Sequence, residues 1–61
     1  MIEVKTAFGV VRAKVKELGG KPVDVAPEYE DCRRLALESG HDLRVVMRAV
    51  SEAARVELGL D

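Results

Sequence analysis

The spacing of apolar residues changes at Pro27, and this change limits the folds open to the chain. Before Pro27 apolar and polar residues alternate, as in half-buried strands: Ile2, Val4 and Thr6 fall on one face, and Val11, Ala13 and Val15 on one face of a second run. Phe8-Gly9 and Gly19-Gly20 read as turns, and a short third strand runs through Val23 and Val25. Pro22 predicts that this strand lies at an edge of the sheet.

After Pro27 the apolar residues follow the helical period. A first helix is expected to start in the turn at Pro27, to bury Tyr29, Cys32, Leu35 and Ala36, and to end at Gly40. Asp42 is the expected N-cap of a second helix that Gly59 ends. The apolar stripe of that helix comprises Leu43, Val46, Met47, Val50, Ala53, Ala54 and Leu58. The pattern predicts an α+β fold, a small three-stranded antiparallel β-β-β sheet followed by two amphipathic helices.

The chain's 61 residues predict a single domain, residues 1–61, with a small core. Domains of this size are commonly reinforced by disulfides, a structural metal or self-association. One cysteine cannot form an internal disulfide, and one cysteine with one histidine cannot supply a structural zinc site. Self-association is the remaining means of reinforcement, so we expect a homo-oligomer.

Charge and hydropathy exclude several classes of function. The formal net charge of −1 lacks the basic footprint of a non-specific nucleic-acid binder. No apolar run approaches the ~20 residues that span a bilayer, and the N-terminal residues MIEVKTAFG have no signal-peptide core. With its lone cysteine, the chain is expected to be cytoplasmic, and neither a membrane nor a nucleic acid is expected as its partner.

The segment GGKPVDVAPEYEDCRRLALESGHDLRVVMRAV, with GVVRAKVKELGG before it, resembles the C-terminal segment of the LarC family of nickel-insertion proteins. The resemblance covers roughly residues 6–54 and is most specific in APEYEDCRRLA. It implies a role in inserting nickel into a pyridinium bisthiocarboxylate mononucleotide, the organonickel cofactor of lactate racemase, with hydrolysis of CTP. It also implies a C-terminal domain that binds CTP with Mn²⁺ or Mg²⁺ and assembles into trimers.

Members of that family are several hundred residues long, so this chain matches only their last part. The resemblance therefore implies a stand-alone short homologue or a fragment, with nickel as the transferred metal. An upstream LarC-like domain on another chain is a possible partner, besides further copies of this chain in a trimer or a multiple of three. Nickel chelatase activity is not expected of so short a chain alone.

Acidic and basic residues near the start of the first helix are the candidate ligand contacts. Glu28 and Asp31 share a helical face and could hold a divalent cation, or simply complement the helix dipole. Arg33 and Arg34 could clamp phosphates, but Glu30 or Glu38 could instead pair with Arg34. Two residues of the second strand complete the candidate nucleotide site, Arg12 and Lys14, whose alternative role is that of a solvated strand face.

Cys32 and His41 are weaker candidates. Soft thiolate ligands suit nickel, but Cys32 falls on the apolar face of its helix, where a free cysteine usually acts as a small hydrophobic residue. His41 follows the glycine that ends the helix and is expected to be exposed.

Two other classes of function fit parts of the sequence. One is a purely structural homo-oligomeric module without a ligand. The other is a ribbon-helix-helix-like DNA-binding dimer, in which the strand before the helices would enter the major groove. Against the latter, Asp24 would face DNA, Pro22 would interrupt the intermolecular strand pairing, and the upstream strands would have no role.

Overall fold

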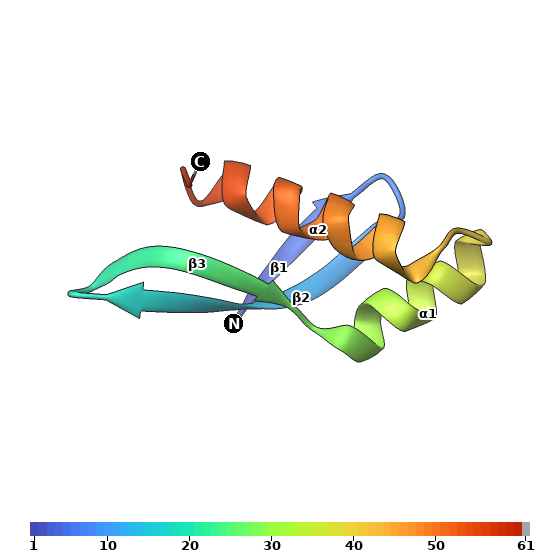
Figure 1. Ribbon diagram of the computed structural model, residues 1–61, viewed down its shortest axis with the longest axis horizontal. Helices are drawn as coiled ribbons and strands as arrows, with labels where there is room; N and C mark the ends of the chain where they lie inside the picture. The colour runs from blue at the N-terminus through green and yellow to red at the C-terminus, as the bar shows by residue number, and fades with distance from the viewer. Residues whose placement is uncertain (61) are drawn as a thin grey trace.

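The computed structural model describes residues 1–60 and confirms the predicted α+β order (Figure 1). Three antiparallel strands form a sheet in the order β1-β2-β3, and two helices follow. The elements are β1 (Ile2–Thr6), β2 (Gly9–Leu18), β3 (Lys21–Pro27), α1 (Tyr29–Ser39) and α2 (Leu43–Glu57). Helix α2 runs along one face of the sheet, and α1 lies beyond the end of β3 (Figure 1).

Glycines shape both hairpin turns. Gly19 and Gly20 connect β2 to β3 with φ values of 61° and 79°, the left-handed conformation that a tight hairpin needs. In the first hairpin, the Thr6 hydroxyl donates to the Gly9 carbonyl at 2.8 Å and accepts from the Phe8 N–H at 3.1 Å. Gly9 has a φ of 135°, which favours glycine.

The core combines the apolar rows predicted from the two periods. Alternate strand residues point toward the helices, and each helix buries its apolar stripe against them. The buried apolar residues are Val4, Val11, Ala13, Val25, Cys32, Leu35, Ala36, Val46, Val50 and Ala54. As predicted, β3 is an edge strand, so the missing N–H of Pro22 costs little there.

The start of α1 differs from the prediction. Pro27 is the last residue of β3, paired with Ala13, and Glu28 occupies the N-cap with φ −72° and ψ 120°. The fixed φ of proline suits an edge strand as well as a first helical turn, so the residue type did not distinguish the two. Because the helix begins at Tyr29, that side chain lies beside the buried stripe and remains 52% exposed.

The other helix ends follow the expected capping. Gly40, with φ 72°, ends α1 and donates its N–H to the Ala36 carbonyl at 3.0 Å. The Asp42 carboxylate accepts from the Arg44 N–H at 2.8 Å and so caps α2. Helix α2 ends at Glu57, two residues before Gly59. Within residues 1–60, no helix is both long and apolar enough to cross a membrane.

The β2–β3 hairpin projects past the helices and gives the molecule an elongated shape of 39 × 18 × 16 Å (Figure 1). A register shift between Lys16 and Glu17 interrupts the ladder on the way to its tip. Val23, which lies opposite that shift, is 49% exposed, and Leu18, beyond it, is 74% exposed. The projecting hairpin therefore carries apolar surface that the rest of residues 1–60 leaves uncovered.

Candidate functional site

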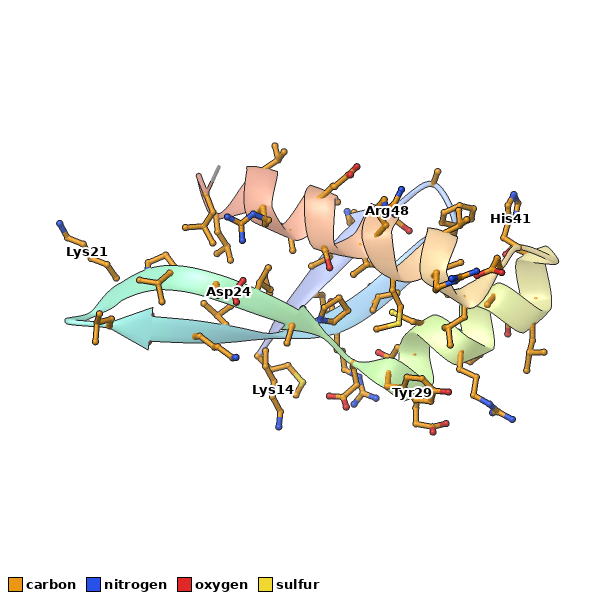
Figure 2. The ribbon with its side chains drawn as sticks, viewed as in Figure 1. Lys14, Lys21, Asp24, Tyr29, His41 and Arg48 are labelled. Carbon is orange, nitrogen blue, oxygen red and sulfur yellow. The ribbon has the colours of Figure 1, made fainter. Side chains whose placement is uncertain are left out.

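The candidate site lies on the outer face of the sheet, where β3 gives way to α1. Arg12 and Lys14 alternate with the buried Val11 and Ala13, so their side chains point away from the core. Figure 2 shows Lys14 on the side of the sheet opposite α2. Lys14 pairs with Ala26 in β3, and Arg12 lies next to the point where β3 ends.

Arg12 and Asp31 form the central interaction of this site. The Arg12 Nε and Nη2 atoms donate to Asp31 Oδ2 and Oδ1, both at 2.9 Å, in a two-point guanidinium–carboxylate pair. The Arg12 backbone N–H also donates to Asp31 Oδ2, at 3.0 Å. Asp31 is 8% exposed, whereas the Arg12 side chain is 56% exposed.

The strand-to-helix junction explains why Asp31 occupies this position. The Glu28 N–H donates to the Arg12 carbonyl at 2.8 Å, which continues the β2–β3 ladder by one bond. The Glu28 carbonyl instead accepts from the Cys32 N–H at 3.1 Å as the first bond of α1. The Arg12 N–H has thus lost its strand partner, and the Asp31 carboxylate replaces it.

These bonds shift the ionisation of both groups. The side-chain hydrogen bond from Arg12, followed by its backbone N–H, holds the pKa of Asp31 well below the usual range, and burial opposes this only in part. The hydrogen bond to Asp31 raises the pKa of Arg12, and the charges of Glu28 and Glu3 add to the effect. The Arg12 guanidinium therefore sits among three carboxylates.

The two arginines of α1 are placed differently from each other. Arg34 lies close enough to Asp31 to contribute to lowering its pKa, and its Nη1 is 3.7 Å from Glu38 Oε1, one of the two pairings expected. Arg33 pairs with Glu30 at 3.9 Å. Exposed pairs of this kind hold their side chains only weakly, so both guanidiniums can exchange partners. Arg12 and Arg34 therefore both lie near Asp31, whereas Arg33 pairs with Glu30 instead.

The described residues contain no cluster of three or more His, Cys, Asp or Glu side chains suited to a metal ion. Of the two expected metal-binding acids, Asp31 already uses both oxygens to bind Arg12. Glu28 is half-buried beside Arg12 and is the better placed of the two to contact a cation. A divalent ion here would need oxygen ligands from a bound phosphate and water, as Mg²⁺ commonly has in nucleotide sites.

Cys32 is buried in the core, whereas His41 is exposed, as expected, and its ring contacts one aromatic neighbour. Cys32 is 0% exposed, and burial, with a smaller contribution from the Asp31 charge, raises the pKa of its thiol. The His41 ring lies 4.7 Å from that of Phe8, edge to face at 60°. Cys32 thus acts as a core residue, as its position on the apolar face indicated.

The helical period predicted that Tyr29 is buried, but the residue is 52% exposed. Its side chain points away from α2, on the same side of the molecule as Lys14 (Figure 2). The signal that could have revealed it is its place directly after Glu28, since a residue in the first helical turn precedes the buried stripe.

Comparison with known proteins shows which family the chain resembles. The model of the nickel insertion protein family matches residues 1–47. A pyridinium-3,5-bisthiocarboxylic acid mononucleotide nickel insertion protein of Desulfitobacterium hafniense strain Y51 is 38% identical over 58 residues, which are 95% of this chain and 14% of that protein. A putative nickel insertion protein of Pelobacter propionicus is 46% identical over 59 residues, 97% of this chain and 15% of that protein.

A solved structure shares the fold. It is that of LarC2, described as the C-terminal domain of a cyclometallase involved in the synthesis of the NPN cofactor of lactate racemase, in its apo form. The match has a TM-score of 0.77 at 32% identity and covers 87% of this chain and 36% of that one. The chain thus spans about a seventh of the length of the curated relatives cited above and about a third of that domain.

Proposed function

Because the chain belongs to the nickel insertion protein family, we propose that it is a CTP- and divalent-metal-binding, oligomer-forming module in the synthesis of an organonickel cofactor. Nickel is the transferred metal in this proposal, and the acceptor is the pyridinium-3,5-bisthiocarboxylic acid mononucleotide named for its relatives. Since this chain corresponds to a small part of those relatives, nickel insertion itself would also require an upstream LarC-like domain.

The observation that carries the nucleotide proposal is the fixed guanidinium of Arg12. Asp31 holds its Nε and Nη2 atoms, and the Arg12 side chain is still 56% exposed, so the donors on Nη1 can reach a ligand on the sheet face that also carries Lys14. A guanidinium held in advance loses little side-chain entropy when it binds a phosphate. Arg34, which lies about one helical turn after Asp31 in α1, can leave its weak pair with Glu38 and add a further contact to the phosphates.

Carboxylates around Arg12 make the proposed binding depend on a metal. Asp31, Glu28 and Glu3 surround the guanidinium and would repel a bare triphosphate. A divalent cation bound to the phosphates would neutralise that repulsion and could take Glu28 as a protein ligand. The metal thus enters with the nucleotide, which is consistent with the lack of a preformed cage among the described residues.

Nickel ligands are not apparent in the described part of the chain. The thiol of Cys32 is fully buried and protonated, and the thiolate is the form that binds metals. We therefore assign the nickel-carrying step to the upstream LarC-like domain and the nucleotide and assembly roles to this segment.

Calorimetric titration tests the nucleotide site. With Mn²⁺ or Mg²⁺ present we expect CTP to bind at least about ten-fold more tightly than without it, because the cation offsets the carboxylate charge. Lys14→Ala and Arg34→Ala should weaken binding. Lys21→Ala should not, because Lys21 lies at the tip of the projecting hairpin (Figure 2). Binding that needs no metal, or equal affinities for the Lys14 and Lys21 variants, would contradict the site.

Assembly is the second part of the proposal, and its support is exposed apolar surface. Among residues 1–60 the outer edges of β1 and β3 have no strand neighbour, and Leu18, Val23 and Val56 are exposed. We expect sedimentation at micromolar concentration to show a homotrimer or a multiple of three. Leu18→Ser should shift the equilibrium toward monomer, whereas Leu37→Ser, a matched change on α1, should not. A stable wild-type monomer would contradict the assembly role.

The two alternative functions lead to different results. A purely structural module would assemble without binding CTP. The DNA-binding alternative requires β3 for intermolecular pairing, but one edge of β3 already pairs with β2, and Asp24 is bound to Arg55 of α2 at 3.2 Å. These contacts favour the nucleotide proposal over DNA binding.

A further inference from the structure

The chain's single tyrosine occupies an unusual position beside the proposed phosphate contacts. Tyr29 is the first residue of α1, and 52% of it is exposed although its ring is among the largest apolar groups of the chain. The other aromatic residue, Phe8, packs on His41 and against the core. An exposed ring at a defined position, rather than in a mobile loop, is suited to contact a ligand.

Backbone contacts place Tyr29 next to the cationic strand. The residue before it, Glu28, is hydrogen-bonded to the Arg12 carbonyl at 2.8 Å. Lys14 lies two residues further along β2, and both Lys14 and Tyr29 point away from α2 (Figure 2). An apolar ring and cationic groups thus share one face, as required by a ligand with an aromatic part and an anionic part.

We propose that Tyr29 is the stacking platform for the base of the bound nucleotide, while Arg12 and Lys14 contact its phosphates. This inference rests on the proposed nucleotide site and adds the residue that recognises the base. Stacking accepts any base, since every base has a π-face. Tyr29 therefore selects a nucleotide over an inorganic polyphosphate but does not by itself select cytosine.

Inorganic triphosphate separates stacking from phosphate binding. Titrated with Mg²⁺, CTP should bind wild type about ten-fold or more tightly than inorganic triphosphate does, because only CTP can stack. In Tyr29→Ala the affinity for CTP should fall to that for inorganic triphosphate, which itself should be unchanged. Tyr29→Phe should keep the wild-type preference, because phenylalanine retains the ring. Circular dichroism would check that each variant is folded.

The chain also contains its own optical reporter. It has no tryptophan and one tyrosine, so its emission comes from Tyr29. Addition of CTP with Mg²⁺ should quench this emission, and triphosphate with Mg²⁺ should leave it unchanged.

The possible outcomes distinguish this inference from the proposal on which it rests. If CTP binds but Tyr29→Ala binds it as tightly as wild type, Tyr29 is not the platform and the nucleotide site stands. Equal losses for CTP and triphosphate would show a structural role and overturn the inference. A shift of Tyr29→Ala toward monomer in sedimentation, with the CTP preference intact, would assign the ring to a subunit interface. No binding of CTP or triphosphate to wild type would overturn both proposals.

Discussion

Replacing Asp31 with alanine should lower the free energy of unfolding by on the order of 2 kcal/mol, the largest effect expected of any single charged residue here. The substitution removes a two-point ion pair and leaves the Arg12 backbone N–H without its partner. Because the Arg12 side chain is 56% exposed, water can solvate the freed guanidinium, which keeps the loss below that for a fully buried pair. Urea unfolding followed by circular dichroism measures the change.

Matched variants separate the parts of this effect. Glu30→Ala removes an exposed acid from the same turn, paired with Arg33 only at 3.9 Å, and should change stability by less than about 0.5 kcal/mol. Asp31→Asn keeps an oxygen for the Arg12 N–H but loses the charge, so its stability should lie between wild type and Asp31→Ala. Equal stabilities for the Glu30 and Asp31 alanine variants would contradict the role assigned to the pair.

The same pair sets the expected acid sensitivity. The folded-state pKa of Asp31 lies below its unfolded value of about 3.9, so its stabilising contribution is complete above that pH. It is lost as the pH falls below about 4 toward the lowered folded-state pKa. The difference in stability between wild type and Asp31→Asn should therefore be largest near neutral pH and shrink under acid conditions.

The sequence predicted the elements of this fold better than it predicted the site. Alternation in the strands and the stripe from Leu43 to Leu58 depend on neighbours within one element, and local periodicity captures them. Arg12 and Asp31 are 19 positions apart, and they meet because β3 ends opposite Ala13. No local pattern reports that junction, so Asp31 was considered with its helical neighbour Glu28 rather than with its strand partner.

Tyr29 illustrates the same limit at a helix end. The three-residue spacing of Tyr29 and Cys32 puts them on one helical face wherever the helix begins, so periodicity made both core candidates. Burial depends instead on what covers that face. Tyr29 is the first residue of α1, next to the end of β3, and its ring stays half-exposed, whereas Cys32 is buried.

Gly9 should be the glycine at which substitution is most damaging. Gly9→Ala is expected to lower the free energy of unfolding by about 3 kcal/mol, because two penalties coincide. Its φ of 135° lies outside the left-handed region that an alanine can occupy at moderate cost. In addition, an added Cβ would lie 3.1 Å from Leu35 Cδ2, so the side chain that anchors α1 to the sheet would have to move.

Gly19→Ala is the matched control for this prediction. Its φ of 61° is within the left-handed region, and an added Cβ would have no heavy atom within 4 Å, so a loss of only about 1 kcal/mol is expected. Urea unfolding of both variants against wild type measures the difference. Similar losses would contradict both penalties assigned to Gly9. A larger loss for Gly9 would support their combination, in which backbone strain and the Leu35 contact together tie the first hairpin to α1, the helix that carries Asp31 and Tyr29.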